Sequence, residues 1–210
     1  MKNNCSLCGM QGTIFREIKS RIYYHCPNCK SIYMDPKNYL APQQEKERYE
    51  QHNNDVNDPG YQQFVSPIVK AVQKDYRPGA IGLDYGCGTA PVITKLLKDE
   101  GYELNLYDPF FANYPENLKM KYDYIVCCEV MEHFHSPREE FHKLRSLLKP
   151  RGTLYMKTSI YGDHINFDAW YYKNDPTHVF FYSKETLEWI QQHFQFSDLI
   201  IEEKYIKFTL

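Results

Sequence analysis

The stretch AIGLDYGCGTA, residues 80–90, decides the fold of this chain. Within it, residues 81–85 read as a short buried strand, and residues 90–100 continue with the pattern of a helix. Gly86 and Gly88 between them predict a tight turn that a ligand can approach closely, because glycine has no Cβ and tolerates positive φ. Ligands of open α/β sheets bind at the carboxyl ends of the strands, where such a loop lies. The stretch therefore predicts a strand, a glycine loop and a helix around a binding site.

The glycine pattern excludes two common nucleotide loops. A dinucleotide fingerprint requires G-x-G-x-x-G, and Pro91 stands where its third glycine would be. No lysine follows the glycines in the manner of a phosphate-binding loop. Asp84 at the strand end would also repel an anionic ligand. A cationic or neutral nucleoside is therefore the better fit.

The segment LDYGCGTA resembles the first motif of class I S-adenosylmethionine (SAM) dependent methyltransferases. Asp84, Gly86 and Gly88 match the motif. Cys87 occupies its variable position, and Ala90 replaces its third glycine. The resemblance implies an α/β fold, a Rossmann-like sheet with helices on both faces, and SAM as the cofactor bound by these residues. The alternative is a plain strand-to-helix turn of another α/β protein.

A second acidic residue ends the next predicted strand, at residues 103–108. Asp108 stands where a carboxylate accepts hydrogen bonds from both ribose hydroxyls of a bound nucleoside. The alternative is that an aspartate before proline only forms a turn. Residues 109–121 are too short for a helix and a third strand, which departs from the family pattern. That strand normally supplies an acid to the adenine, so we assign no adenine contact.

Residues 122–137, YDYIVCCEVMEHFHSP, resemble the fourth motif of these enzymes, which lies beside the methyl acceptor. Glu129, Glu132 and His133 are spaced so that a helical turn points them the same way. Two carboxylates and an imidazole can hold a divalent cation. We also count Glu129 among the cofactor contacts. We favour the competing interpretation, in which the E-x-x-E-H pattern caps the strand and shapes the cofactor pocket without a metal.

The same pattern resembles two branches of the family, the ubiquinone-pathway O-methyltransferases and the plant small-RNA 2′-O-methyltransferases. Both place a later histidine ahead of an aromatic stretch, and His178 in the segment DPTHVF is similar. A histidine with a pKa near neutrality is the usual base for a hydroxyl acceptor. We therefore predict that His133 and His178 converge at the methyl-accepting side of the cofactor. The catalytic candidates are Glu129, Glu132, His133 and His178.

Residues 161–182 connect the last predicted parallel strand to the final helix without clear periodicity. An irregular connection longer than roughly 15 residues is usually functional or disordered. Its many aromatic side chains argue against disorder, so we expect it to wall an acceptor pocket. These side chains are Phe167, Trp170, Tyr171, Tyr172, Phe180, Phe181 and Tyr182.

Four cysteines near the N-terminus form two C-x-x-C pairs, Cys5 with Cys8 and Cys26 with Cys29. Two such pairs at this separation can complete a closed tetrahedral zinc site. Disulfides or free thiols are the alternative, and the absence of a secretory signal disfavours disulfides. Two strands of a hairpin, residues 13–18 and 21–25, lie between the pairs. We therefore predict a zinc ribbon at residues 1–35, held together mainly by metal binding.

Residues 36–75 separate this ribbon from the methyltransferase domain at residues 76–210, and we expect a linker and helices that cover the cofactor. Residues 43–52 are polar with helical propensity. Residues 61–75 carry an apolar helical stripe, and we expect their helix to begin at Pro67. The candidate lid residues are Tyr49, His52 and Tyr61. For the first two, we favour a polar helix that faces water.

Composition restricts the class of protein. A chain of 210 residues can bury one full core, and its formal net charge of −2 does not point to nucleic acid or an anionic membrane. No apolar signal region opens the sequence, and no apolar run reaches the roughly 18 residues that a membrane span needs. We therefore expect a cytoplasmic protein without membrane association.

We expect the chain to methylate a small-molecule acceptor, with a hydroxyl oxygen as the leading acceptor atom. The first alternative is methylation of RNA that docks on the zinc ribbon. Clustered cations favour it, namely Lys2, Arg16, Lys19, Arg21 and Lys30. The second alternative is a non-catalytic SAM-binding scaffold or sensor, against which the acceptor-side histidines argue.

Overall fold

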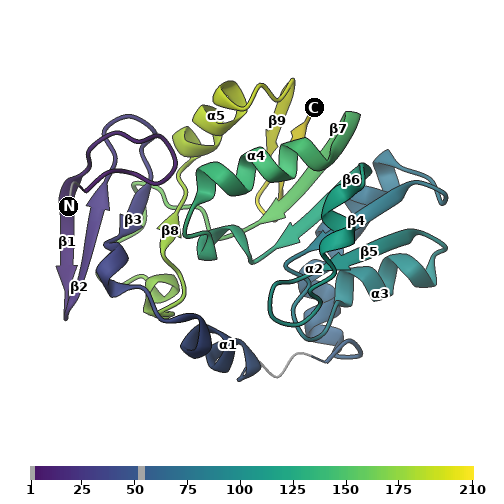
Figure 1. Cartoon of the computed structure of the whole chain (residues 1–210), viewed down its shortest axis with the longest axis horizontal. Coiled ribbons are helices and arrows are strands. Elements are labelled where there is room, and N and C mark those ends of the chain that lie inside the picture. Colours follow the sequence, from purple (N-terminus) through teal and green to yellow (C-terminus); the bar gives the residue numbers. More distant parts are fainter. Residues whose placement is uncertain (1–2, 52–54) are drawn as a thin grey trace.

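A six-stranded sheet with the order β5-β4-β6-β7-β10-β9 forms the centre of the computed structural model, which describes residues 3–51 and 55–210 (Figure 1). Strands β5, β4, β6 and β7 are parallel, whereas β10 and β9 close the sheet as an antiparallel hairpin. The Rossmann-like sheet expected from the sequence is therefore confirmed. Its strands are β4 (Ile81–Tyr85), β5 (Glu103–Tyr107), β6 (Tyr122–Cys128), β7 (Leu148–Lys157), β9 (Asp198–Ile201) and β10 (Ile206–Thr209).

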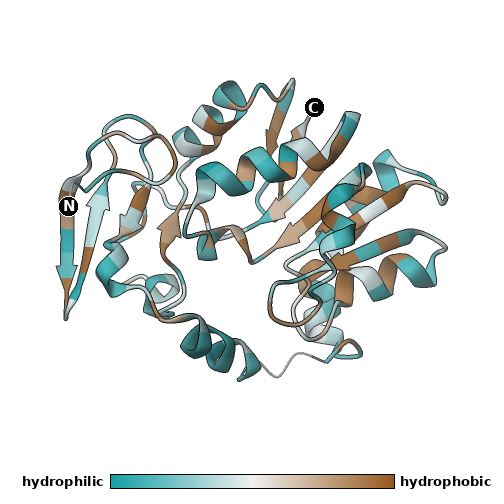
Figure 2. Cartoon of the chain, in the orientation of Figure 1, coloured by the Kyte–Doolittle hydropathy of each residue, from teal (hydrophilic) through white to brown (hydrophobic). Residues whose placement is uncertain are grey.

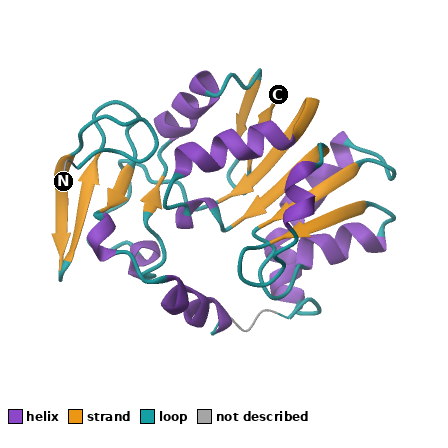
Figure 3. Cartoon of the chain, viewed as in Figure 1, coloured by secondary structure: helices purple, strands orange, loops and turns teal. Residues whose placement is uncertain are grey.

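Helices cover both faces of this sheet (Figure 3). Successive strand residues point to opposite faces, so Ile125 and Val126 of β6 belong to different cores. The core around Val126 includes apolar residues of α2 (Pro59–Asp75) and α3 (Val92–Asp99). The core around Ile125 includes those of α4 (Pro137–Leu147) and α5 (Lys184–His193).

Helix α2 begins at Pro59 and not at Pro67, so that prediction was wrong. Asp58 caps the helix by accepting hydrogen bonds from two backbone amides. Pro67 lies inside the helix and has no N–H for the carbonyl of Gln63, four residues earlier. The Ser66 hydroxyl donates to that carbonyl instead, over 2.9 Å. This local replacement lets the helix continue through the proline.

The connection from β5 to β6 contains only the short 3-10 helix η2 (Pro115–Lys119). The expectation that residues 109–121 cannot supply a third strand is therefore confirmed. Among the described residues, β5 is consequently the edge strand at this side of the sheet.

A second sheet has the order β1-β2-β3-β8 and lies beside the first (Figure 1). The hairpin strands β1 (Thr13–Ile18) and β2 (Arg21–His25) agree with the sequence prediction. Strand β3 (Ile32–Met34) then pairs with β8 (Phe180–Phe181), which comes from the aromatic connection. Strands β1, β2 and β3 of the N-terminal segment therefore share one sheet with β8, which lies in the C-terminal half of the chain.

Helix α1 (Pro42–Glu50) joins the two sheets and is strongly hydrophilic, in contrast to the central strands (Figure 2). The remaining elements are the 3-10 helices η1 (Pro36–Asn38), η3 (Met131–His133) and η4 (Tyr171–Asn174). Among the described residues, no helix is long and apolar enough to cross a membrane.

Candidate functional site

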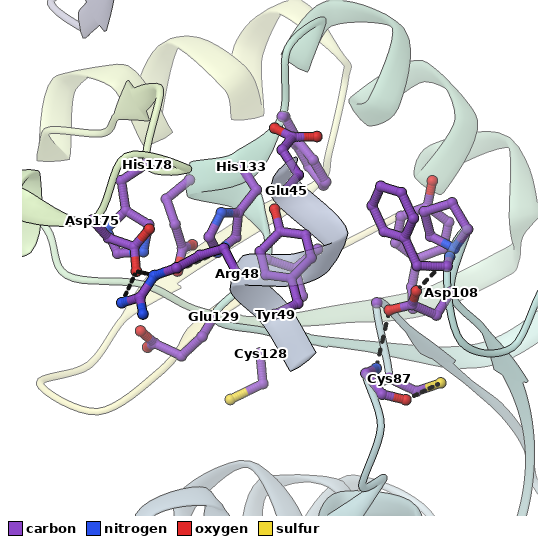
Figure 4. Close-up of a pocket in the computed structure, with 18 of the residues that line it drawn as sticks. Glu45, Arg48, Tyr49, Cys87, Asp108, Cys128, Glu129, His133, Asp175 and His178 are labelled. Carbon is purple, nitrogen blue, oxygen red and sulfur yellow. Dashed lines mark hydrogen bonds and ion pairs between the residues drawn. The ribbon is translucent and has the colours of Figure 1, made fainter. Parts of the chain in front are cut away.

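A cavity of about 1130 Å³ lies where the carboxyl ends of β4, β5 and β6 meet helix α1 and the segment 171–178. Figure 4 shows Cys87 and Asp108 on one side of it, and Asp175 and His178 on the other. Tyr49 of α1 lies between the two sides. The cavity therefore has a side formed by the glycine loop and a side formed by the histidines.

The glycine loop requires both of its glycines, for different reasons. Gly86 has φ of 77°, and a Cβ there would lie 2.5 Å from Val130 Cγ2. Gly88 has φ of 62°, and a Cβ there would meet nothing within 4 Å, so the space beside it is open. Both glycines and Cys87 line the cavity. The loop thus offers a ligand the close backbone approach expected from the sequence.

Asp84 lies behind this loop and is not among the residues that line the cavity. It is buried and accepts a hydrogen bond from the Thr94 hydroxyl over 2.7 Å. Burial raises the pKa of its carboxyl to about 6, although the bond from Thr94 opposes this change. The structure therefore gives the Asp84 carboxyl a contact with α3, and the cofactor contact expected for it stays a prediction.

Asp108 lines the cavity and also organises the turn after β5. Its Oδ1 accepts from the amides of Phe110 at 2.8 Å and Phe111 at 3.1 Å. Its Oδ2 accepts from the amide of Gly88 at 3.0 Å, which ties the turn to the glycine loop. Because a carboxylate has about four acceptor positions, these three bonds leave capacity for a hydroxyl.

On the opposite side of the cavity, Tyr172 joins the two carboxyl groups of the E-x-x-E-H segment. Its hydroxyl lies 2.6 Å from Glu132 Oε1 and 3.1 Å from Glu129 Oε2. Burial is the main cause that raises the pKa of Glu129 to about 8 and that of Glu132 to about 7. The charge of Glu132 raises the pKa of Glu129 further. The sequence indicated Tyr172 only as an aromatic wall residue, because nothing local predicts what a buried tyrosine hydroxyl contacts.

The structure brings His133 and His178 together, with ring centroids 4.8 Å apart. His133 Nδ1 lies 3.0 Å from the Thr177 carbonyl oxygen, and His178 Nδ1 lies 2.7 Å from that of Tyr172. A carbonyl oxygen only accepts hydrogen bonds, so each Nδ1 carries the proton. In the neutral rings, Nε2 is then the basic atom.

These two rings and Glu132 form one cluster. Each of the three side chains offers one atom that could bind a metal ion, and these three atoms all lie within 4.8 Å of one another. Glu132 is fully buried, and its Oε2 has no hydrogen-bond partner among the described residues. Glu129 lines the same cavity but is not part of this three-residue group.

Helix α1 covers the cavity and contacts both of its sides. Arg48 donates to Asp175 Oδ2 from Nε at 3.1 Å and from a terminal nitrogen at 2.8 Å. Tyr49 packs against His133 and Phe110, with ring centroids 5.3 Å and 5.8 Å apart. Glu45 Oε1 lies 2.8 Å from His135 Nε2.

Two of the three candidate lid residues, Tyr49 and Tyr61, line the cavity. The third, His52, lies outside the described residues. The contacts of Tyr49 show that α1 does not simply face water.

The four N-terminal cysteines lie together in reduced form. Their Sγ atoms are all within 4.8 Å of one another, with Cys5 to Cys29 at 3.5 Å and Cys8 to Cys26 at 3.3 Å. A zinc tetrahedron with bonds of about 2.3 Å places its sulfurs about 3.8 Å apart, so this arrangement fits zinc with little movement. Gly9 and Lys30, which directly follow the two pairs, have positive φ and form tight turns there.

Solved structures share this fold at low sequence identity. An O-methyltransferase family protein from Burkholderia thailandensis has a TM-score of 0.55 at 13% identity, covering 81% of this chain and 63% of its own. The 1,6-didemethyltoxoflavin-N1-methyltransferase of the same organism, with bound 1,6-didemethyltoxoflavin and S-adenosylhomocysteine, has a TM-score of 0.53 at 14% identity, covering 93% and 97%. The present chain thus spans less than two thirds of the first of these proteins.

An N-methyltransferase of Haemonchus contortus, in complex with phosphomonomethylethanolamine and S-adenosylhomocysteine, has a TM-score of 0.59 at 14% identity. That match covers 81% of this chain and 48% of the nematode protein. No curated protein sequence gave a significant match. A family model described as a methyltransferase domain matches residues 34–200, which is more than half of the sequence, and this chain therefore belongs to the methyltransferase-domain family.

Proposed function

We propose that this protein is a SAM-dependent methyltransferase that acts on a small-molecule acceptor. The observation that carries the proposal is one cavity with the glycine loop and Asp108 on one side, and His133 and His178 on the other. The 1,6-didemethyltoxoflavin-N1-methyltransferase structure supports it, since that protein holds 1,6-didemethyltoxoflavin and S-adenosylhomocysteine together. Within the cavity, Gly86, Cys87, Gly88, Asp108 and Glu129 are the proposed cofactor contacts.

When bound, SAM supplies a methyl group that its sulfonium already activates. The protein's task is mainly to position the acceptor, which is worth roughly 7–11 kcal/mol in well-oriented systems. A hydroxyl acceptor must also lose its proton as its oxygen forms the new bond. In our proposal, Nε2 of His133 or His178 takes that proton, since Nδ1 of each ring is held by a carbonyl oxygen.

Glu132 and Tyr172 would hold this pair of histidines in place. The Tyr172 hydroxyl binds Glu132, and the Tyr172 carbonyl accepts from His178. The backbone amide of Val179 donates to the Glu132 carbonyl over 2.9 Å. These bonds connect residues around 132 with residues 172–179, and therefore keep the acceptor side of the cavity fixed.

A divalent cation on Glu132, His133 and His178 is the second version of this mechanism. The short separations of their ligand atoms and the unpaired Glu132 Oε2 support it. One carboxylate and two imidazoles suit a first-row transition metal. A bound cation would orient the acceptor oxygen and favour its ionised form.

We further propose that residues 1–35 form a zinc ribbon with one zinc on Cys5, Cys8, Cys26 and Cys29, followed by a covering segment at 36–75 and the methyltransferase domain at 76–210. The family match begins at residue 34, which supports the first boundary. RNA is a less favoured substrate, because carboxylates are frequent in the cavity wall. They belong to Glu45, Asp108, Glu129, Glu132, Glu139, Glu140 and Asp175.

The proposal is tested by incubating the protein with radiolabelled SAM and fractionated small-molecule extract or total RNA. We expect labelled small molecules that are absent with a His133→Ala variant. Label in RNA would favour methylation of RNA that docks on the proposed zinc ribbon. Tight SAM binding without any transfer would favour a scaffold or sensor.

A further inference from the structure

A second cavity, of about 310 Å³, lies between the tip of the β1–β2 hairpin and helix η4. Its lining combines residues that are distant in sequence, and we call it the cationic pocket. The lining residues are Ile18, Lys19, Ser20, Arg21, Tyr23, Lys173 and Asn174. Three of these side chains are cationic, and none is a carboxylate.

Lys173 is the unusual member of this pocket, because it is only 5% exposed. Its ammonium group donates to the Trp170 carbonyl at 3.3 Å and to Asn174 Oδ1 at 3.2 Å. Both acceptors are neutral. Buried lysines are rare unless they are paired with an opposite charge.

The neighbouring cations add to this excess of charge. Arg21 donates to the Lys173 carbonyl over 3.4 Å, which holds its guanidinium beside η4. Lys19 occupies the hairpin turn with φ of 56°, in the left-handed region. Like charges around one small cavity repel each other. An anion bound between them would replace this repulsion by attraction.

We propose that the cationic pocket binds an oxyanion, namely the phosphate or carboxylate group of the methyl acceptor. Arginine and lysine are the side chains that recognise such groups, and the Ser20 hydroxyl can add a hydrogen bond. Asn174 lines both the cationic pocket and the main cavity, so η4 is their shared wall. The link to the acceptor rests on the proposed function, whereas anion binding by the pocket does not.

The test uses the full zinc-loaded chain and inorganic phosphate, with acetate as the carboxylate probe and KCl at matched ionic strength. We expect saturable phosphate binding by calorimetry and a phosphate-dependent rise in Tm. Lys173→Met should weaken phosphate binding by roughly tenfold or more and abolish the rise in Tm. Without phosphate, its Tm should equal or exceed that of the wild type, because an unpaired buried charge has been removed.

Arg16→Gln is the matched control, since Arg16 lies on the same hairpin, pairs with the exposed Asp168 and does not line the pocket. It should change phosphate affinity by less than about twofold. Arg21→Gln, at a partly exposed position, repeats the test if Lys173→Met does not fold. Stronger binding of acetate would support the same site with a carboxylate as its ligand.

Two results would overturn the proposal. One is a wild-type protein that responds to phosphate no more than to KCl. The other is an equal loss of binding in Arg16→Gln and Lys173→Met, which would indicate diffuse attraction to a basic surface. A protein that binds phosphate but not SAM would refute the proposed function and leave the pocket intact.

Discussion

His133 and His178 lie with their rings 4.8 Å apart and inclined by 69°, although they come from different segments of the chain. His133 belongs to η3 after β6, and His178 belongs to the connection after β7. Strands β6 and β7 are parallel neighbours, so their carboxyl ends deliver both segments to the same edge of the sheet. The structure therefore brings the two histidines together, while their position at the methyl-accepting side of the cofactor and their catalytic role stay predictions.

Replacing either histidine by alanine should lower turnover by about 100-fold or more, the range for losing a positioned acid-base group. SAM affinity, measured by calorimetry, should stay within about twofold of the wild type because the proposed cofactor contacts at Cys87 and Asp108 lie across the cavity. His164→Ala is the control, since His164 is exposed and does not line the cavity. Full turnover in both cavity variants would exclude a role for the pair.

The cation version makes a separate prediction. A chelator that spares the four-cysteine site should abolish turnover, and Mn²⁺ or Mg²⁺ should restore it. Turnover that is unaffected by chelation, yet lost with His178→Ala, would leave only the metal-free base.

Asp108→Asn should weaken SAM binding by about 1–3 kcal/mol, because the amide offers one acceptor oxygen fewer to the ribose hydroxyls. Asparagine retains the oxygen that organises the turn at Phe110 and Phe111, which makes it a milder change than alanine. Asp198→Asn, at an exposed position on β9, is the control. Equal SAM affinity in wild type and Asp108→Asn would leave Asp108 as a turn former alone.

Asp84 should make the free energy of unfolding depend on pH. Its pKa is raised from 3.8 to about 6 in the folded protein, so the folded state binds more protons than the unfolded state between these values. The contribution of Asp84 to the free energy of unfolding is therefore fully present below about pH 3.8 and is lost as the pH rises through about 6.

Asp84→Asn removes this titration while an amide oxygen can still accept from Thr94. Relative to wild type, its free energy of unfolding should rise by about 2 kcal/mol between pH 4 and pH 7, measured by urea unfolding of the SAM-free protein. Asp123→Asn should show the opposite trend, at pH values near and below 3.8, since the Lys149 ammonium and the Ile81 amide lower the pKa of Asp123 despite its partial burial. If the free energy of unfolding changed with pH in the same way in wild type and Asp84→Asn, Asp84 would not be the group with the raised pKa.

The proposed zinc ribbon should influence the acceptor side of the cavity through the backbone. Met34 of β3 donates to the Val179 carbonyl over 2.8 Å, and Val179 in turn donates to the carbonyl of Glu132. Elemental analysis should find one zinc per chain, lost in Cys26→Ser. Zinc loss should speed hydrogen exchange at residues 179–181, with SAM affinity nearly unchanged.

The amides of β10 serve as the internal control in the same exchange experiment, because β10 lies in the other sheet. Unchanged exchange at residues 179–181 after zinc loss would show that β8 does not depend on the ribbon. A folded N-terminus without any metal at native cysteines would refute the zinc site itself.

Local patterns in the sequence predicted the elements whose structure depends on nearby residues. The strand at 81–85 and the hairpin at 13–25 were read from alternation and turn residues, and the glycine loop from its need for positive φ. The start of α2 was missed because the Ser66 hydroxyl compensates for Pro67, which no propensity anticipates.

The rest depends on contacts between distant segments. Pairing of β3 with β8 joins residues 32–33 to residues 180–181, and no local pattern specifies that register. The Tyr172 hydroxyl between Glu129 and Glu132, and the position of Asp84 behind the loop, likewise follow from packing. The sequence could therefore predict the cavity and its two histidines, but not the bonds that hold them.

Calorimetric titration of the purified protein with S-adenosylhomocysteine, SAM and NAD distinguishes the proposed cofactor from a dinucleotide. We expect one SAM or S-adenosylhomocysteine site per chain with micromolar affinity, weakened by Asp108→Asn. We expect no tight binding of NAD, because the glycine pattern lacks the third glycine of the dinucleotide fingerprint. Tight NAD binding without any binding of SAM or S-adenosylhomocysteine would contradict both expectations.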